Sequence, residues 1–157
     1  MYKLDPAVKT VWTFNYFIRF TIYSILLFVV DYLFLHSELI EIPLKTGILS
    51  LILFSLGVIC SLVLPSLNYK YWEFEIKDKE IILHRGIINR VRTLAPYSKI
   101  QHIDVQQSVL ERFYSLSRLV LYTAGTRGAD VILPGIPIEY AEQLRDSLKD
   151  ITAQESL

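Results

Sequence analysis

The sequence has few groups that could support a reaction or a covalent crosslink. Its 157 residues include a single cysteine, Cys60, which lies in an apolar run and which we interpret as a packing residue. It contains none of the common catalytic or binding motifs: no G-x-S-x-G, no glycine-rich phosphate-binding loop with its lysine, no H-E-x-x-H and no C-x-x-C. We therefore expect no enzyme activity, no cofactor and no metal.

The histidines and carboxylates do not change that expectation. His36, His84 and His102 are far apart in the sequence, which argues against a shared metal site. Glu73 and Glu75 resemble a carboxylate pair, but two residues on the same side of an alternating strand are typical of a solvated face.

A surplus of charge of one sign is also missing. Lysine and arginine total 16, aspartate and glutamate total 16, and the formal net charge is zero. Proteins that bind nucleic acid through its phosphates need a clear basic excess. We therefore expect no nucleic-acid partner.

Apolar residues are abundant, at 52% of the chain, and they are concentrated between residues 14 and 65. Two runs there reach the roughly 20 residues that a helix needs to cross the hydrocarbon core of a membrane. We predict transmembrane helices at residues 13–35 and 46–65. The alternative, that the first run is a signal peptide, lacks a small-x-small cleavage site after residue 35, and a second span follows at once.

Basic residues predict the orientation of these spans. They flank both spans on the side of the termini, whereas the connecting residues carry Glu38 and Glu41 against Lys45. The positive-inside rule then predicts a cytoplasmic N-terminal segment (1–12), an extracytoplasmic loop (36–45), a cytoplasmic domain (66–152) and a tail (153–157). About five residues would link the second span to the domain.

Two ionisable residues interrupt the first span. Arg19 is close enough to the inner interface to extend its charged end into the headgroups. Asp31 lies near the outer end, where an acid also reaches headgroups, but an acid within a membrane is a candidate functional site. Both remain candidates for an intramembrane polar site.

Beyond residue 65 the apolar pattern changes to a period of two, which is typical of half-buried strands. A helical period returns at the end, where Ala141, Leu144 and Leu148 share one face. The sequence predicts a small, mostly-β barrel or curved sheet with a C-terminal capping helix. We expect strands at 71–76, 81–85, 87–94, 100–106, 119–123 and 131–133, a short helix at 109–116 and the final helix at 137–151.

The order of these features resembles the bacterial pleckstrin-homology-like domain family, formerly a domain of unknown function. The resemblance rests on Arg85-Gly86-Ile87-Ile88 and above all on the stretch from Leu94 to Gln107, with its I-Q-x-x-x-V-x-Q core. Together with the two preceding helices, the chain is similar to the YdbS-like membrane subgroup. One departure is Ser115, where the family usually has glycine.

This resemblance implies a function that is not catalytic. Such domains are thought to mediate protein association at the membrane, so we expect a multi-pass protein of the bacterial plasma membrane that binds the lipid bilayer and a larger membrane protein with tandem copies of the domain. A homo-oligomer is an alternative assembly.

Two other functions remain open. Four cations, Lys77, Lys79, Arg90 and Arg92, are candidate contacts for an anionic headgroup, which would make the domain a lipid-binding or lipid-sensing module. The plainer interpretation is a basic strand face near an anionic leaflet, diluted by neighbouring acids. A small membrane enzyme or transporter subunit would instead depend on Asp31.

Overall fold

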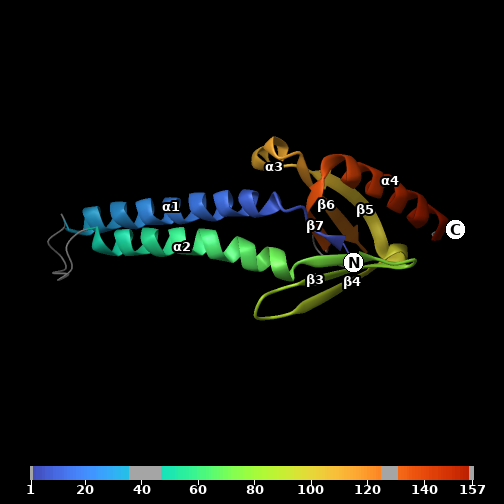
Figure 1. Cartoon of the computed structure of the whole chain (residues 1–157), viewed down its shortest axis with the longest axis horizontal. Helices are drawn as coiled ribbons and strands as arrows, with labels where there is room; N and C mark the ends of the chain where they lie inside the picture. The colour runs from blue at the N-terminus through green and yellow to red at the C-terminus, as the bar shows by residue number, and fades with distance from the viewer. Residues whose placement is uncertain (1, 36–46, 125–130, 156–157) are drawn as a thin grey trace. The chain divides into compact units, whose positions relative to one another are not determined.

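The computed structural model describes residues 2–35, 47–124 and 131–155 of the chain. These residues divide into two compact units: one comprises residues 12–66, and the other combines residues 1–11 with residues 67–157. In chain order the elements are β1 (Tyr2–Lys3), α1 (Val8–Leu35), α2 (Ile48–Tyr71), β2 (Glu73–Ile76), β3 (Glu80–Arg85), β4 (Val91–Pro96), a 3-10 turn η1 (Tyr97–Lys99), β5 (Ile100–Gln106), α3 (Val109–Phe113), β6 (Leu116–Thr123), β7 (Val131–Pro137) and α4 (Ile138–Glu155) (Figure 1).

The first unit is a pair of long apolar helices. At 1.5 Å per residue, the 28 residues of α1 and the 24 residues of α2 are about 42 and 36 Å long, enough to cross a bilayer. Their leucines are turned outward: Leu26, Leu33, Leu51 and Leu62 are each between 61% and 65% exposed. Water is a poor solvent for such a surface and lipid a good one, so the two long apolar helices predicted from the sequence are confirmed and their surface suits a membrane.

Small residues let the two helices approach each other closely. A Cβ atom added at Gly57 would lie 2.5 Å from the Cβ of Phe20, a distance that only glycine allows. The hydroxyl of Ser24 donates a hydrogen bond of 2.7 Å to the carbonyl of Ser50 on the other helix. Close backbone contact at glycine and serine is the usual way in which helices associate inside a membrane.

The second unit is a domain of two antiparallel sheets, ordered β1-β2-β3-β4 and β5-β6-β7. Alternation along the strands places Phe74, Ile81, Leu83, Leu119 and Leu121 in the core, where each is at most 2% exposed. Helix α4 contacts β5, β6 and β7 through its apolar face, which buries Ala141 and Leu148. The predicted mostly-β fold with a C-terminal helix is confirmed.

Residues 2–11 also belong to this domain, which no pattern in the sequence predicts. Strand β1 pairs with β2 in the register Tyr2↔Phe74 and Lys3↔Glu73. Leu4, Val8 and Val11 are buried in the unit that contains the sheets. The two long helices are therefore an insertion between two neighbouring strands of one sheet.

Several element boundaries differ from the sequence prediction, and two of these differences shape the end of the first sheet. Helix α2 continues through Pro65 to Tyr71, so a single residue, Trp72, rather than about five, separates it from β2. Strand β4 begins at Val91 instead of residue 87, because Gly86 adopts a φ of +107° and starts a turn. Within α2, Pro65 has no backbone N–H for the helical hydrogen bond, a loss that a membrane helix tolerates when its surroundings compensate.

The departure at Ser115 coincides with an unusual backbone conformation. Ser115 has a φ of +52°, and it is the one described residue other than glycine with a positive φ. A left-handed conformation costs most residues roughly 1–2 kcal/mol, and glycine avoids that cost. The glycine that the family usually carries here therefore has a physical reason.

We expect Ser115→Gly to stabilise the domain by about 0.5–1 kcal/mol, because it removes the left-handed strain. The matched control is Ser147→Gly, the same substitution on the exposed face of α4, which should cost about 0.5–1 kcal/mol of helix propensity. Chemical denaturation of the full chain in detergent measures both. If both variants lost stability equally, the strain at Ser115 would be refuted.

Candidate functional site

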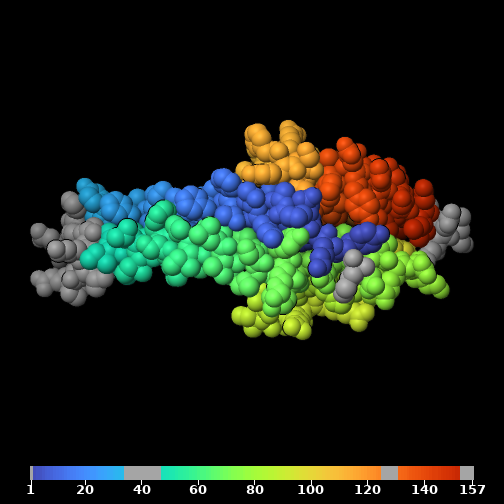
Figure 2. Space-filling model, in the orientation of Figure 1, coloured from blue at the N-terminus to red at the C-terminus, as the bar shows by residue number. Residues whose placement is uncertain are grey.

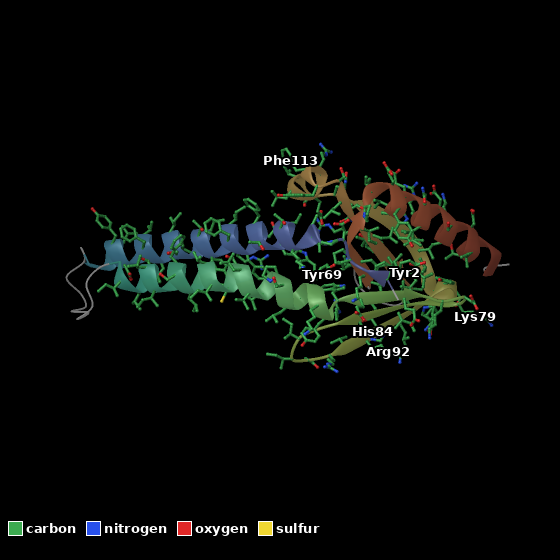
Figure 3. The ribbon with its side chains drawn as sticks, in the orientation of Figure 1. Tyr2, Tyr69, Lys79, His84, Arg92 and Phe113 are labelled. Atoms are coloured by element: carbon green, nitrogen blue, oxygen red, sulfur yellow. The ribbon has the colours of Figure 1, made fainter. Side chains whose placement is uncertain are left out.

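The four cations predicted to contact an anionic headgroup do not gather in one place. Lys77 and Lys79 lie in the β2–β3 turn, where the carbonyl of Lys79 accepts a hydrogen bond of 3.1 Å from the backbone N–H of Tyr97. Arg92 pairs with His84 near the opposite end of β3, and Arg90 precedes β4 at that same end. Figure 3 shows Lys79 apart from His84 and Arg92.

The register between β3 and β4 gives the distance between the two groups of cations, Lys77 with Lys79 and Arg90 with Arg92. Glu80 pairs with Pro96, and His84 pairs with Arg92 four residues further along β3. At roughly 3.3 Å per residue, the two groups of cations are about 13 Å apart along the strand. Lys77 also lies 3.9 Å from the carboxylate of Glu75. A single phosphate would not bridge the two groups.

A hollow of about 300 Å³ lies at the end of the first sheet where α2 leads into β2. We call it the basic pocket, and define it by Lys70, Glu73, His84, Arg85, Gly86 and Arg90, which line it. Pairing of β2 with β3 sets His84 opposite Glu73, and the turn at Gly86 brings Arg90 back beside Arg85. Of the predicted headgroup contacts, only Arg90 lines the pocket.

The basic pocket carries more positive than negative charge. Lys70, Arg85 and Arg90 contribute three cations against the one carboxylate of Glu73. None of the three forms an ion pair with an acid in the described part of the chain. The Nζ of Lys70 lies 5.7 Å from the centre of the Tyr71 ring. These cations keep their capacity to bind an anion from outside the protein.

Sequence reasoning missed Lys70 and Arg85 as site residues. Lys70 was counted only toward membrane orientation, and Arg85 only toward orientation and the family resemblance, because 15 positions separate them and no local motif joins them. Their placement in the sequence could have identified them as site residues: Lys70 follows the second apolar run, and Arg85 precedes Gly86 in the next turn.

A second feature of the domain is an apolar surface on α3, which we define by Val109, Phe113 and Tyr114. Val109 is 75% exposed and Phe113 is 81% exposed, and their spacing of four places both on one side of the helix. Phe113 lies on α3 in Figure 3, and the atoms of α3 form a raised part of the domain surface in Figure 2.

Polar contacts hold this short helix firmly. Ser108 and Glu111 form a capping box: the backbone N–H of Ser108 donates to the Glu111 carboxylate at 2.6 Å, and the Ser108 hydroxyl accepts from the N–H of Glu111 at 3.3 Å. The same carboxylate lies 3.4 Å from an amino group of Arg118. The amide of Gln107 donates to the carbonyl of Leu116 at 2.7 Å. Helix α3 is thus fixed to β6 while its apolar side chains face outward.

The predicted intramembrane polar residues do not meet. Arg19 and Asp31 are 12 positions apart on α1, or about 18 Å at 1.5 Å per residue. Arg19 is exposed and Asp31 is partly exposed. Among the described residues, no three histidine, cysteine or acidic side chains lie together as the ligands of a metal ion would.

The histidines lie in separate surroundings. His84 lines the basic pocket, and His102 lies on β5 with its Nε2 at 2.7 Å from the carboxylate of Asp104. His36 lies outside the described residues. A further hollow of about 330 Å³ between β5 and α4 has Arg145 on its wall, but that arginine is already paired with Asp146 at 2.8 Å.

Comparison with known proteins identifies the family to which the chain belongs. The sequence model described as "Bacterial PH domain" matches residues 21–152 of the chain, which covers the second half of α1, all of α2 and the domain from β2 into α4. The chain belongs to this bacterial PH domain family. The resemblance expected from the sequence is confirmed.

Individual relatives are more distant. The UPF0699 transmembrane protein YdbS of Bacillus subtilis (strain 168) is 28% identical over 103 residues, which are 66% of this chain and 63% of that protein. The match therefore spans less than two thirds of the relative's length. A crystal structure of a DUF1696 family protein with a pleckstrin-homology domain, from Shewanella loihica PV-4, is similar over 55% of this chain and 71% of that one, with 19% identity and a TM-score of 0.37.

Proposed function

We propose that this membrane protein of the bacterial PH domain family is a non-catalytic subunit whose domain associates with another membrane protein. Its two helices anchor it in the bacterial plasma membrane with both termini in the cytoplasm, in line with the placement of lysine and arginine around the spans. The partner is a larger membrane protein that carries similar PH domains, as the family resemblance implies.

The observation that carries this proposal is the apolar surface on α3. A short helix that exposes Val109 and Phe113 so fully loses free energy in water, unless another surface covers it. Aromatic side chains on a rigid support are typical centres of protein interfaces, because little conformational entropy is lost when they bind. The capping box and the Arg118 contact supply that rigidity.

A photo-crosslinking experiment tests the proposal. Benzoylphenylalanine, which is similar in shape to phenylalanine, replaces Phe113 in the full chain, and cells are irradiated before extraction in mild detergent. We expect a crosslinked product with a membrane protein that contains PH domains. Adding Val109→Ser should reduce its yield by about tenfold, because that substitution puts a polar group beside Phe113 on the same surface.

The matched control places the same crosslinker at Leu94, which is 51% exposed on β4 of the first sheet, whereas α3 adjoins β6 of the second sheet. The crosslinker at position 94 should give little of that product. Equal yields from both positions would contradict a specific interface at α3. An adduct with phospholipid alone would show that the α3 surface faces the bilayer, and would overturn the proposal.

A further inference from the structure

We propose that the basic pocket binds the phosphate of an anionic lipid headgroup. This site is distinct from the α3 surface and from the four cations predicted by sequence, with which it shares only Arg90. Its position supports a lipid as the ligand. The apolar sequence of α2 extends from Ile48 to Leu67, about the length that spans the hydrocarbon core, and Lys70 follows one helical turn later. Connectivity alone therefore holds the pocket near the headgroup layer.

The chemistry of the lining residues suits a phosphodiester. Arg85 and Arg90 present planar guanidinium groups that can each donate two hydrogen bonds to phosphate oxygens, and Lys70 adds a point charge. All three side chains are exposed, so they can reach a ligand that arrives from the membrane surface. The volume of about 300 Å³ is at the small end of ligand pockets, which fits a headgroup rather than a whole lipid.

The acidic residue in the pocket favours one class of headgroup. Glu73 is a hydrogen-bond acceptor, and next to it lies His84, its partner across the β2–β3 ladder. A headgroup that carries hydroxyl donors beyond its phosphate, such as the glycerol of phosphatidylglycerol, satisfies Glu73 while the arginines hold the phosphate. The trimethylammonium group of phosphatidylcholine has no such donor.

The turn that forms one wall of the pocket also carries an apolar anchor. Ile88 is 98% exposed and lies between Gly86 and Arg90, which both line the pocket. Gly86 fixes the shape of this turn, because a Cβ atom there would overlap the carbonyl oxygen of Asn89. An isoleucine held in the open beside a phosphate site is the arrangement expected of a side chain that enters the acyl region while its neighbours bind the headgroup.

Titration of the detergent-purified full chain with short-chain phosphatidylglycerol, followed by native mass spectrometry, tests this proposal. Binding should be about tenfold weaker for the double variant Arg85→Gln, Arg90→Gln. The charge-matched control is Lys77→Gln, Lys79→Gln, which removes two exposed cations at the other end of the sheet and should change the affinity less than twofold. Short-chain phosphatidylcholine should bind at least about tenfold more weakly than phosphatidylglycerol.

Further arms identify the source of the phosphate. Ile88→Ser should weaken binding of the short-chain lipid but leave binding of glycerol 3-phosphate unchanged, since only the lipid has acyl chains. If glycerol 3-phosphate bound as tightly as the lipid, a soluble phosphate compound would be the ligand and the lipid assignment would be overturned.

Equal losses of affinity in the two double variants would show that the attraction is a bulk charge effect, and would overturn the assignment of the basic pocket as the binding site. Phe113→Ser should leave lipid binding unchanged, so this proposal and the proposed protein interface are tested independently.

Discussion

Replacing Gly135 with alanine is expected to destabilise the PH domain by about 3 kcal/mol. Gly135 lies on β7 with a φ of +63°, a left-handed conformation that costs other residues roughly 1–2 kcal/mol. A Cβ atom there would also lie 2.8 Å from the Cβ of Val8, inside contact distance. Since the carbonyl of Gly135 accepts the N–H of Asp5 at 2.9 Å, the clash should release the N-terminal segment from the domain.

Chemical denaturation of the full chain in detergent measures this loss, and hydrogen exchange at residues 2–8 reports release of the segment. A double-mutant cycle with Val8→Gly separates the two causes, because it removes the Cβ and both methyl groups of Val8, which a Cβ atom at position 135 would approach. Removing them should relieve about 1 kcal/mol of the cost, while the backbone strain remains. A Gly135→Ala variant within 0.5 kcal/mol of the parent chain would refute the close approach of Val8.

Replacing Glu111 with alanine should cost about 2–3 kcal/mol, because its carboxylate has two partners. It caps α3 through Ser108 and pairs with Arg118, and Glu111 is only 6% exposed. Loss of an N-terminal cap costs about 1 kcal/mol, and an arginine left without its acid costs more where it is shielded from water. The Arg118 side chain is 38% exposed, which keeps the total below that of a fully buried pair.

A glutamine at position 111 keeps an oxygen that can accept the Ser108 N–H and removes only the charge. We expect Glu111→Gln to cost about 1 kcal/mol, between the parent chain and the alanine variant. Glu142→Ala on the exposed face of α4 is the control and should stay within about 0.5 kcal/mol. Denaturation midpoints give the order of stability of these variants. The alanine variant should also lose the crosslink from benzoylphenylalanine at position 113, since α3 no longer holds that side chain in place.

Patterns within one element could be predicted from the sequence. Alternation identified the strand of Phe74, which is buried, and the helical period identified Ala141 and Leu148 on the buried face of α4. The two apolar runs were visible from length alone. Each of these signals depends on neighbouring residues, which obey the period of a strand or a helix.

Features that depend on long-range pairing could not be predicted. Strand β1 has two residues, too few to show a period, and the apolar Val8 and Val11 resemble the start of the first span. The basic pocket required the register between β2 and β3, which brings Glu73 beside His84. The same register separates Lys77 from Arg90, although both flank β3 in the sequence.

The pairing of β1 with β2 also determines when the domain can be completed during synthesis. Tyr2 leaves the ribosome some 70 residues before its partner Phe74, with both membrane helices between them. The first strand must therefore wait, unpaired, until both helices and the rest of the sheet have emerged. The PH domain is completed by a strand that precedes both membrane helices in the sequence, so it cannot close before they have been synthesised.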